Sequence, residues 1–236
     1  MSGHSKWSTI KRQKEATDSK RGAIFTKIGN QIALAARGGT DPSINSALAL
    51  AIEKAKAANM PQANIQRAID RVKDKSSAVL EEVVYEAYGP GGIGIIIEAA
   101  TDNKNRTFPE VRTAITKNGG TMADSGSVAF QFTRKGVIRV KASGEDALLT
   151  ILDCGAEDAE ERDGEIVVYT VAGDLAKVRQ AIKDAQLEII DAELQYVPNN
   201  VIEISDSEVE RKILKIMDVL DELDDVSSVH SNFDLV

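Results

Sequence analysis

The spacing of apolar residues changes near residue 80, and this change limits the folds that the chain can adopt. Before that point apolar residues recur every three or four positions, as at Ile24, Ile28 and Ile32, which predicts amphipathic helices. From residue 81 onward they are mostly β-branched and gather in short runs such as EEVVYEAY, which predicts strands. The chain therefore begins as a helical module and continues as a mixture of strands and helices.

Three helices are expected in the first module. They are the run from Ile24 to Ala35 that stops at Gly38-Gly39, residues 44–58, and residues 61–75. The second helix would bury Ile44 and the third would bury Val72. Asn59 and Gln62 have the spacing of a capping box at the start of the third helix. The result would be a small helical bundle.

The remainder predicts an α+β fold. Its first elements are strands 81–88 and 93–100, a helix with the capping box Thr107–Glu110 and Pro109 in its first turn, and a strand at VAFQF (128–132). Residues 137–197 then read β-α-β-β-α-β, the ferredoxin-like order. The last elements are strand 201–205, a helix with the capping box Ser205–Glu208, and a strand near 226–233.

This order predicts an N-terminal helical bundle followed by two ferredoxin-like α+β domains, one inserted into the other. The segment 81–133 lacks elements that the C-terminal segment supplies, whereas the middle segment is complete by itself. The expected domains are a basic helical domain (1–78), a split α+β domain (79–134 plus 199–236) and an inserted α+β domain (135–198).

Charge divides the chain in the same way as the hydrophobic pattern. The formal net charge is −8, yet residues 1–75 hold nine Lys and five Arg against six Asp or Glu, a net charge of +8. The rest of the chain therefore carries −16. A basic module joined to an acidic body indicates a module that meets phosphates.

Known catalytic and metal-binding patterns are missing from the sequence, so no enzyme, cofactor or metal site is expected. Gly89, Gly91 and Gly94 match G-x-G-x-x-G, but an isoleucine run follows instead of a helix, so a hairpin turn is the better interpretation. The single Cys154 is interpreted as a small buried hydrophobe. Adjacent carboxylates such as Asp224-Asp225 are expected to be solvated. With no membrane-length apolar stretch and no secretory signal, a cytoplasmic protein is expected.

The N-terminal module contains the first candidate site. Its cationic side chains would neutralise phosphates, and Trp7 would stack on an exposed base. The residues are Lys6, Trp7, Lys11, Arg12, Lys14, Lys20, Arg21, Lys27, Arg67 and Arg71. The alternative is a solvated tail with Trp7 packed on the bundle.

A second candidate site lies in TDNKNRT. Lys104 and Arg106 precede a helix N-terminus, where backbone N–H groups favour an anion or an acidic partner. A well-capped surface turn is the alternative interpretation.

Two motifs give the chain a specific resemblance. The opening MSGHSKWSTIK and the stretch YGPGGIGIIIEAATDNKNRT (88–107) resemble the YebC family. Ser2, Ala100 and Lys104 depart from that family's commoner residues without removing a charge. The resemblance covers essentially the full chain and implies a helical N-terminal domain with two α+β domains. It also implies regulation of gene expression, because some members are described as binding promoter DNA and others as translation factors at ribosomes stalled on proline-rich stretches.

Three functional hypotheses follow. Residues 44–58 and 61–75 loosely resemble a helix-turn-helix. Its second helix would read DNA bases with Gln62, Asn64, Gln66 and Arg67. The basic stretch 1–14 fits better an arm that orders on ribosomal RNA, with the ribosome as partner. A third hypothesis, a small-ligand sensor, depends on fold analogy alone. Nothing in the sequence indicates a membrane partner or an oligomeric state.

Overall fold

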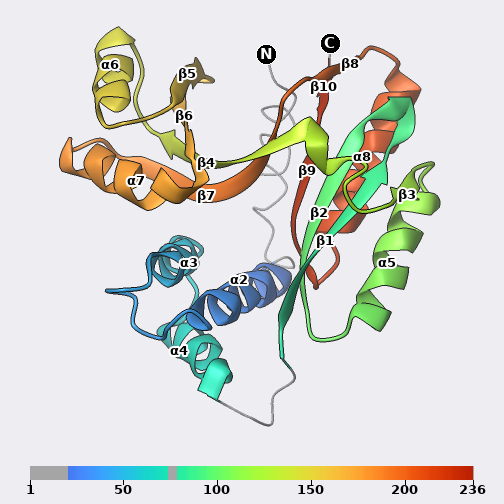
Figure 1. Ribbon diagram of the computed structural model, residues 1–236, viewed down its shortest axis with the longest axis horizontal. Coiled ribbons are helices and arrows are strands. Elements are labelled where there is room, and N and C mark those ends of the chain that lie inside the picture. The colour runs from blue at the N-terminus through green and yellow to red at the C-terminus, as the bar shows by residue number, and fades with distance from the viewer. Residues whose placement is uncertain (1–20, 74–78, 236) are drawn as a thin grey trace. The chain divides into compact units, whose positions relative to one another are not determined.

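The chain folds into two units, one of which is built from both ends of the sequence. Figure 1 shows the computed structural model, which describes residues 21–73 and 79–235. One unit comprises residues 1–131 and 198–236, and the other comprises residues 132–197. The first unit contains the helices of the N-terminal module together with a sheet, and the second contains a separate sheet with two helices.

The N-terminal helices pack around a core of aliphatic side chains. They are α2 (Arg21–Ala36), α3 (Ser46–Ala57), α4 (Gln62–Asp70) and the 3-10 turn Arg71–Lys73. Ile32, Leu48 and Ile65 are fully buried at the helix interface. Asn45 fixes the first corner, because its side chain accepts a hydrogen bond from the Leu48 N–H and donates to the carbonyls of Ala35 and Gly39 at 2.7 Å each. The three predicted helices are therefore confirmed.

The prediction that Ile44 and Val72 face the core is wrong. Ile44 is 83% exposed because α3 begins only at Ser46, after Asn45 has capped the helix. Val72 is 40% exposed because α4 ends at Asp70 and the chain tightens into the 3-10 turn, which rotates the side chain off the apolar stripe.

The predicted capping box at Asn59 is also wrong, because Asn59 ends α3 instead of starting α4. Its φ of 57° is left-handed, and its N–H donates to the Lys56 carbonyl. The N–H of Met60 donates to the Ala55 carbonyl over 2.9 Å. This pair of bonds is a Schellman motif, in which asparagine tolerates the left-handed position after a helix. The N-cap residue of α4 is Pro61, which makes no side-chain capping bond.

The sheet of the first unit has the strand order β3-β1-β2-β9. Its strands are β1 (Glu81–Tyr88), β2 (Gly94–Thr101), β3 (Thr121–Ala123) and β9 (Val226–Ser231). The predicted β1–β2 hairpin is confirmed by antiparallel pairing from Glu81↔Thr101 to Tyr88↔Gly94, so the glycine-rich stretch is a turn. A parallel pair, β8 (Ile202–Ile204) and β10 (Phe233–Leu235), forms a second, smaller sheet.

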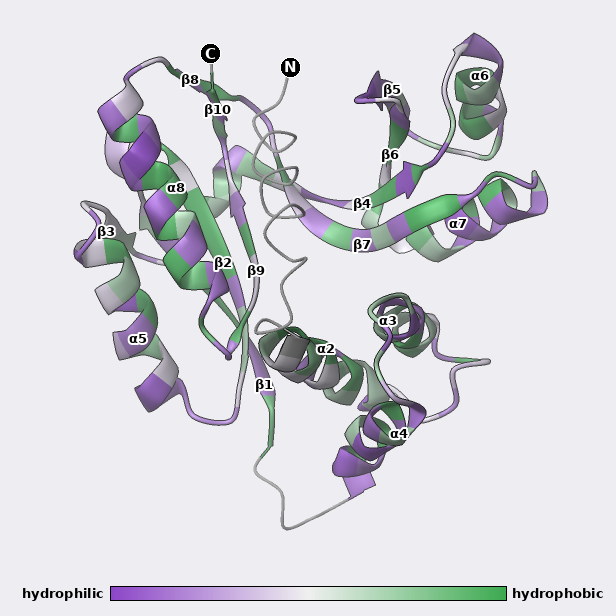
Figure 2. Ribbon diagram, turned by 180° about the vertical axis from the view of Figure 1, so that it is seen from behind, coloured by the Kyte–Doolittle hydropathy of each residue, from purple (hydrophilic) through white to green (hydrophobic). Residues whose placement is uncertain are grey.

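Strand β2 is buried on both faces, which explains its run of isoleucines. Ile95 and Ile97 pack with α5 (Lys104–Thr116) and α8 (Ser207–Asp221), which cover one face of the sheet (Figure 1). On the other face Ala100 packs with Leu80 and with Ala33 of α2. Figure 2 shows the corresponding hydrophobic colouring along β2. The N-terminal helices therefore contact the split sheet directly.

The split domain has ferredoxin-like strand positions with a changed chain order. Strands β2 and β3 both pair antiparallel with β1 and are connected by α5, which makes a split β-α-β unit. The central β1, however, comes first in the chain instead of between the two helices. The α+β fold class is confirmed, and the split domain reaches it by a permuted path.

The strand predicted at VAFQF is wrong. Residues Ala129–Gln131 form a 3-10 turn, and the short β3 takes the edge position. The cause is the buried Glu86, whose carboxylate accepts hydrogen bonds from the N–H groups of Gly126, Val128 and Ala129 at 2.6–2.9 Å. These backbone N–H groups therefore bond to the Glu86 side chain and are not available to pair with a neighbouring strand.

Two further capping boxes are wrong by one or more residues. Helix α5 begins at Lys104, where Asn103 is the cap residue and accepts from the Arg106 N–H, so Pro109 lies beyond the first turn. Helix α8 is capped by Asp206, which accepts from the N–H groups of Glu208 and Val209. In both cases an Asx side chain provides the cap: Asn103 lies four residues before the predicted Thr107, which is inside α5, and Asp206 lies one residue after the predicted Ser205.

The second unit has the predicted ferredoxin-like topology. Its elements are β4 (Phe132–Val140), α6 (Glu145–Asp153), β5 (Asp158–Arg162), β6 (Glu165–Val171), α7 (Leu175–Asp184) and β7 (Ile189–Pro198). The strand order β5-β6-β4-β7 is the expected one for β-α-β-β-α-β. Ile138, Ile151 and Ile182 are fully buried and come from β4, α6 and α7. Gly136 of β4 lies where a Cβ atom would meet Leu175 and Thr170.

Candidate nucleic-acid interface

Helix α4 presents the polar side chains that were predicted to read DNA bases. Residues 58–61 join α3 to α4, and Ile65 and Ile69 hold α4 to the core. Gln62, Gln66 and Arg67 are therefore on the solvent side, and all three are exposed. Gln66 donates to Asp70 over 3.1 Å and Arg67 contacts Asn64 over 3.4 Å, both within α4. These exposed contacts are weak enough to exchange for contacts with a partner.

Two other predicted cations contact the protein itself. The ammonium of Lys27 donates to the backbone carbonyl of Asp221 and lies 3.5 Å from its carboxylate. Arg71 donates to Asn30 over 3.2 Å and lies 3.6 Å from the carboxylate of Asp102. Both side chains therefore connect the N-terminal helices to the split domain.

The rest of the predicted N-terminal site lies outside the described residues. These positions are Lys6, Trp7, Lys11, Arg12, Lys14 and Lys20. Arg21 is the first residue of α2. Of the predicted nucleic-acid residues whose side chains are described, Arg67 is exposed, whereas Lys27 and Arg71 are partly buried.

Lys104 and Arg106 are close together but lie among carboxylates. Lys104 pairs with Glu81 at 2.5 Å, and hydrogen bonding to this ammonium lowers the pKa of Glu81. Arg106 lies 2.7 Å from Asp225 and 3.3 Å from Asp102. Its hydrogen bond to Asp225 raises the pKa of the Arg106 guanidinium. The positive charges of Lys104 and Arg106, which were predicted to bind an anion, are thus largely balanced by carboxylates of the same chain.

Asp225 is the residue that sequence reasoning missed. The pair Asp224-Asp225 was expected to be solvated, but the side chain of Asp225 is only 12% exposed. Its carboxylate accepts from Thr107 at 2.6 Å, Arg106 at 2.7 Å and Thr101 at 3.2 Å. Burial by itself would raise the pKa of Asp225, but these hydrogen bonds outweigh it and lower the pKa. No local signal reveals this role, because the partners lie more than a hundred residues away in the chain.

The described surface offers guanidinium, amide and ammonium groups that bind phosphates and base edges. In residues 21–73 and 79–235, no group of His, Cys, Asp and Glu side chains is arranged to hold a metal ion. Within the same residues no helix is long and apolar enough to cross a membrane. Cys154 is partly buried, and burial raises the pKa of its thiol, as do the nearby charges of Asp153 and Asp184.

Known proteins match the chain over nearly its whole length. The family model for the TACO1/YebC N-terminal domain matches residues 5–75, and the model for the TACO1/YebC second and third domains matches residues 80–233. A protein of Moorella thermoacetica is 45% identical over 100% of this chain and 96% of its own length, and one of Chlorobaculum tepidum is 47% identical with the same coverage. Both are named probable transcriptional regulatory proteins.

A solved structure shares the fold. It is the crystal structure of a conserved hypothetical protein from Aquifex aeolicus, 39% identical, with a TM-score of 0.88. The match covers 93% of this chain and 92% of that one. The two family models together span both the helical module and the α+β units, in the order that the structure has them. The chain belongs to the TACO1/YebC family.

Proposed function

We propose that this chain is a non-catalytic regulator of gene expression in the cytoplasm, and that it binds nucleic acid through its N-terminal helical module. The observation that carries the proposal is the separation of charge: +8 within residues 1–75 and −16 in the remainder. A phosphate backbone is attracted to the first part and repelled by the second, so the field orients the chain on its target.

Duplex DNA is the first candidate target. Helix α4 exposes Gln62 in its first turn and Gln66 and Arg67 further along, and amide and guanidinium groups are the usual readers of adenine and guanine edges in the major groove. The N-cap Pro61 makes no side-chain capping bond, so the N-terminal end of the α4 dipole is not neutralised by a capping side chain and favours a phosphate. The relatives' names, probable transcriptional regulatory proteins, support this candidate.

Ribosomal RNA is the second candidate target. Six of the ten predicted nucleic-acid residues lie in residues 1–20, ahead of the helices that would enter a groove. A basic segment with one tryptophan suits unstacked bases and an irregular phosphate path, as in RNA loops. Under this candidate the protein acts in translation at the ribosome.

Binding titrations with two matched probes test the proposal. The full chain is titrated by fluorescence anisotropy with a 30-base-pair duplex and with a ribosomal RNA fragment of equal charge, each over a series of salt concentrations. For about four phosphate contacts, the logarithm of the affinity falls against the logarithm of salt concentration with a slope of roughly −3 to −4. Affinity that does not change with salt would contradict the proposal.

Two variants separate the targets. Replacing Gln62, Gln66 and Arg67 with Ala should weaken duplex binding if α4 reads DNA. Removing residues 1–14 should weaken the RNA complex and ribosome co-sedimentation if the second candidate holds. Gln180→Ala with Lys183→Ala, at exposed positions of α7, is the matched control and should leave both affinities unchanged.

A further inference from the structure

Helix α6 exposes two large apolar side chains that its own unit does not use. Leu149 is 55% exposed and Leu152 is 42% exposed. Their spacing of three residues places them side by side on one face of the helix. The opposite face supplies the core contact through Ile151, which is fully buried. The two leucines are therefore not required for the packing of α6 on its sheet.

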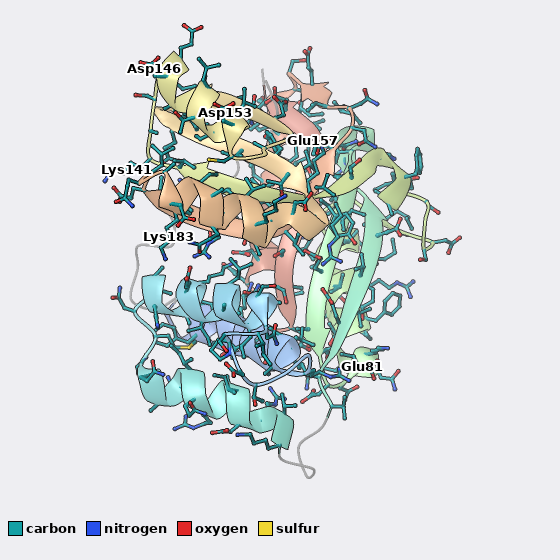
Figure 3. All side chains as sticks on the ribbon, turned by 60° about the vertical axis from the view of Figure 1, so that its left-hand side comes forward. Glu81, Lys141, Asp146, Asp153, Glu157 and Lys183 are labelled. Carbon is teal, nitrogen blue, oxygen red and sulfur yellow. The ribbon has the colours of Figure 1, made fainter. Side chains whose placement is uncertain are left out.

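Carboxylates surround this pair. Helix α6 has the sequence EDALLTILD, in which every charged residue is acidic, and Glu145, Asp146 and Asp153 are all exposed. Figure 3 shows Asp146 and Asp153 along α6, while the labelled Lys141 and Lys183 belong to other segments. The carboxylate of Glu161 from β5 accepts the Gly144 N–H at the start of the helix, which adds a further negative charge there.

The acidic character extends beyond α6. In residues 132–197, Asp and Glu outnumber Lys and Arg by 14 to 8. At the C-terminal end of α6, the charges of Asp153 and Asp184 both raise the pKa of Cys154, beyond the larger effect of burial. The negative end of the helix dipole points the same way. A phosphate approaching this face would be repelled, so a nucleic acid is excluded as its partner.

We propose that the face formed by Leu149 and Leu152 with Glu145, Asp146 and Asp153 is a docking surface for a basic amphipathic helix of a partner protein. An apolar pair spaced by three residues fits the apolar stripe of such a helix. The surrounding carboxylates pair with lysine or arginine at the edge of the contact and reject acidic partners. This surface goes beyond the proposed function, since it gives the acidic unit a partner of its own.

A designed peptide provides the test. The probe is a labelled 18-residue amphipathic helix made of leucine and lysine, titrated into the full chain by fluorescence anisotropy. Two matched peptides have glutamate in place of lysine, or serine in place of leucine. The proposal expects binding of the first peptide, no binding of the glutamate peptide, and at least tenfold weaker binding of the serine peptide.

Variants locate the site on the chain. Leu149→Gln with Leu152→Gln should weaken the leucine–lysine peptide about tenfold or more, since two apolar side chains lose their burial. Val171→Gln with Leu194→Gln, which also removes two exposed apolar side chains of the same unit, is the matched control and should leave the affinity unchanged. Asp146→Lys with Asp153→Lys should abolish binding. Because both leucines are exposed, circular dichroism should show that the Leu149→Gln, Leu152→Gln variant keeps its fold.

Each alternative occupant has an outcome that overturns the proposal. The Val171→Gln, Leu194→Gln control could weaken peptide binding as much as the Leu149→Gln, Leu152→Gln variant does, or the serine peptide could bind as tightly as the leucine–lysine peptide. Either result would show that the peptide is held by charge attraction alone and not by the two leucines. A dimer that becomes monomeric in the leucine variant, measured by sedimentation velocity, would assign the face to a second copy of this chain. Loss of RNA or DNA affinity in the same variant would assign it to nucleic acid, whereas unchanged nucleic-acid affinity keeps this surface distinct from the proposed interface.

Discussion

The hydroxyl of Thr107 donates to the carboxylate of Asp225 over 2.6 Å, joining residues that are 118 positions apart in the chain. Thr107 is fully buried at the start of α5, and Asp225 immediately precedes β9. Because Arg106 and Thr101 bond to the same carboxylate oxygen, Asp225 holds the first turn of α5 against the edge of the split sheet. The TDNKNRT motif is thus part of the structure of the split domain.

Asp225→Asn should destabilise the first unit. The amide keeps one acceptor oxygen but removes the charge that pairs with Arg106, so about 1–3 kcal/mol of unfolding free energy should be lost. Urea denaturation measures the change. Asp224→Asn is the matched control at the exposed neighbour, and its midpoint should stay within error of the unchanged chain. Equal effects of the two substitutions would mean that Asp225 has no special role.

Glu86 should make stability depend on pH in the acid range. Burial would raise the pKa of Glu86, but the three backbone N–H donors outweigh it and hold the pKa below the ordinary value of 4.5. A depressed folded-state pKa contributes stability above the unfolded-state value, and this is lost as pH falls from about 4.5 toward the folded value. Urea midpoints measured between pH 6 and 3 should therefore decline less steeply in Glu86→Gln than in the unchanged chain. Parallel declines in both chains would contradict this assignment.

Substitution of Arg67 should affect nucleic-acid binding, whereas substitution of Arg71 should affect stability, although the two residues lie only about one helical turn apart. Arg67→Ala removes an exposed side chain from α4 and should lower nucleic-acid affinity while leaving the thermal midpoint unchanged. Arg71→Ala removes the contacts to Asn30 and Asp102 and should lower the thermal midpoint by a few degrees. Anisotropy and scanning calorimetry on both variants provide the comparison. A stability loss in Arg67→Ala would show that Arg67, like Arg71, has a structural role.

Asn59 should tolerate glycine better than alanine. Its φ of 57° is a left-handed conformation that costs a Cβ-bearing residue about 1 kcal/mol unless its side chain favours it. Asn59→Ala should therefore lower the unfolding free energy by about 1 kcal/mol, and Asn59→Gly should leave it unchanged or raise it slightly. The order Gly, Asn, Ala in chemical denaturation checks the Schellman assignment, and the reverse order would contradict it.

Gly136→Ala should destabilise the second unit by about 1–3 kcal/mol, because the added Cβ atom would meet Leu175 at 2.9 Å and crowd Thr170. Gly173→Ala is the control, since a Cβ atom added there would have no heavy atom within 4 Å beyond its chain neighbours. Hydrogen exchange of the β4 and β6 amides reports on the second unit separately from the first. Unchanged exchange in Gly136→Ala would show that the strand can shift at no cost.

The sequence predicted elements better than it predicted their ends or their long-range partners. Periodicity is a local property, so the helices around Ile32 and Ile65 and the β-α-β-β-α-β order of the second unit could be found without the structure. The cap depends on where the helix begins, and several nearby Asx and Ser/Thr side chains are possible caps by type. Asn103 and Asp206 were missed because α5 begins four residues, and the cap of α8 lies one residue, away from the predicted position. VAFQF was predicted to be a strand because of its apolar pattern. That pattern does not show that the Glu86 carboxylate accepts hydrogen bonds from backbone N–H groups of this segment.

The sequence names candidate residues by their type, but it does not give the surroundings of their side chains. From the sequence alone, Arg67 and Arg71 are equally good candidates for binding a phosphate, because both are arginines in the same predicted basic helix. Only the fold shows that Arg71 faces Asp102 while Arg67 faces solvent, because that distinction depends on the helix orientation against the split sheet. The same limit applies to Arg106, whose partner Asp225 lies far away in sequence.

The pairing of β2 with β9 has a consequence for synthesis of the chain. Residues 132–197 are contiguous, so the second unit has all its strands once about 200 residues have emerged, and domains generally fold as units in N-to-C order. Strand β2, made much earlier, has no partner on one edge until residues 226–231 arrive. Until then, the unpaired backbone groups along this edge of β2 can pair with a wrong strand or with another chain. The second unit can therefore fold before the sheet of the first unit is complete.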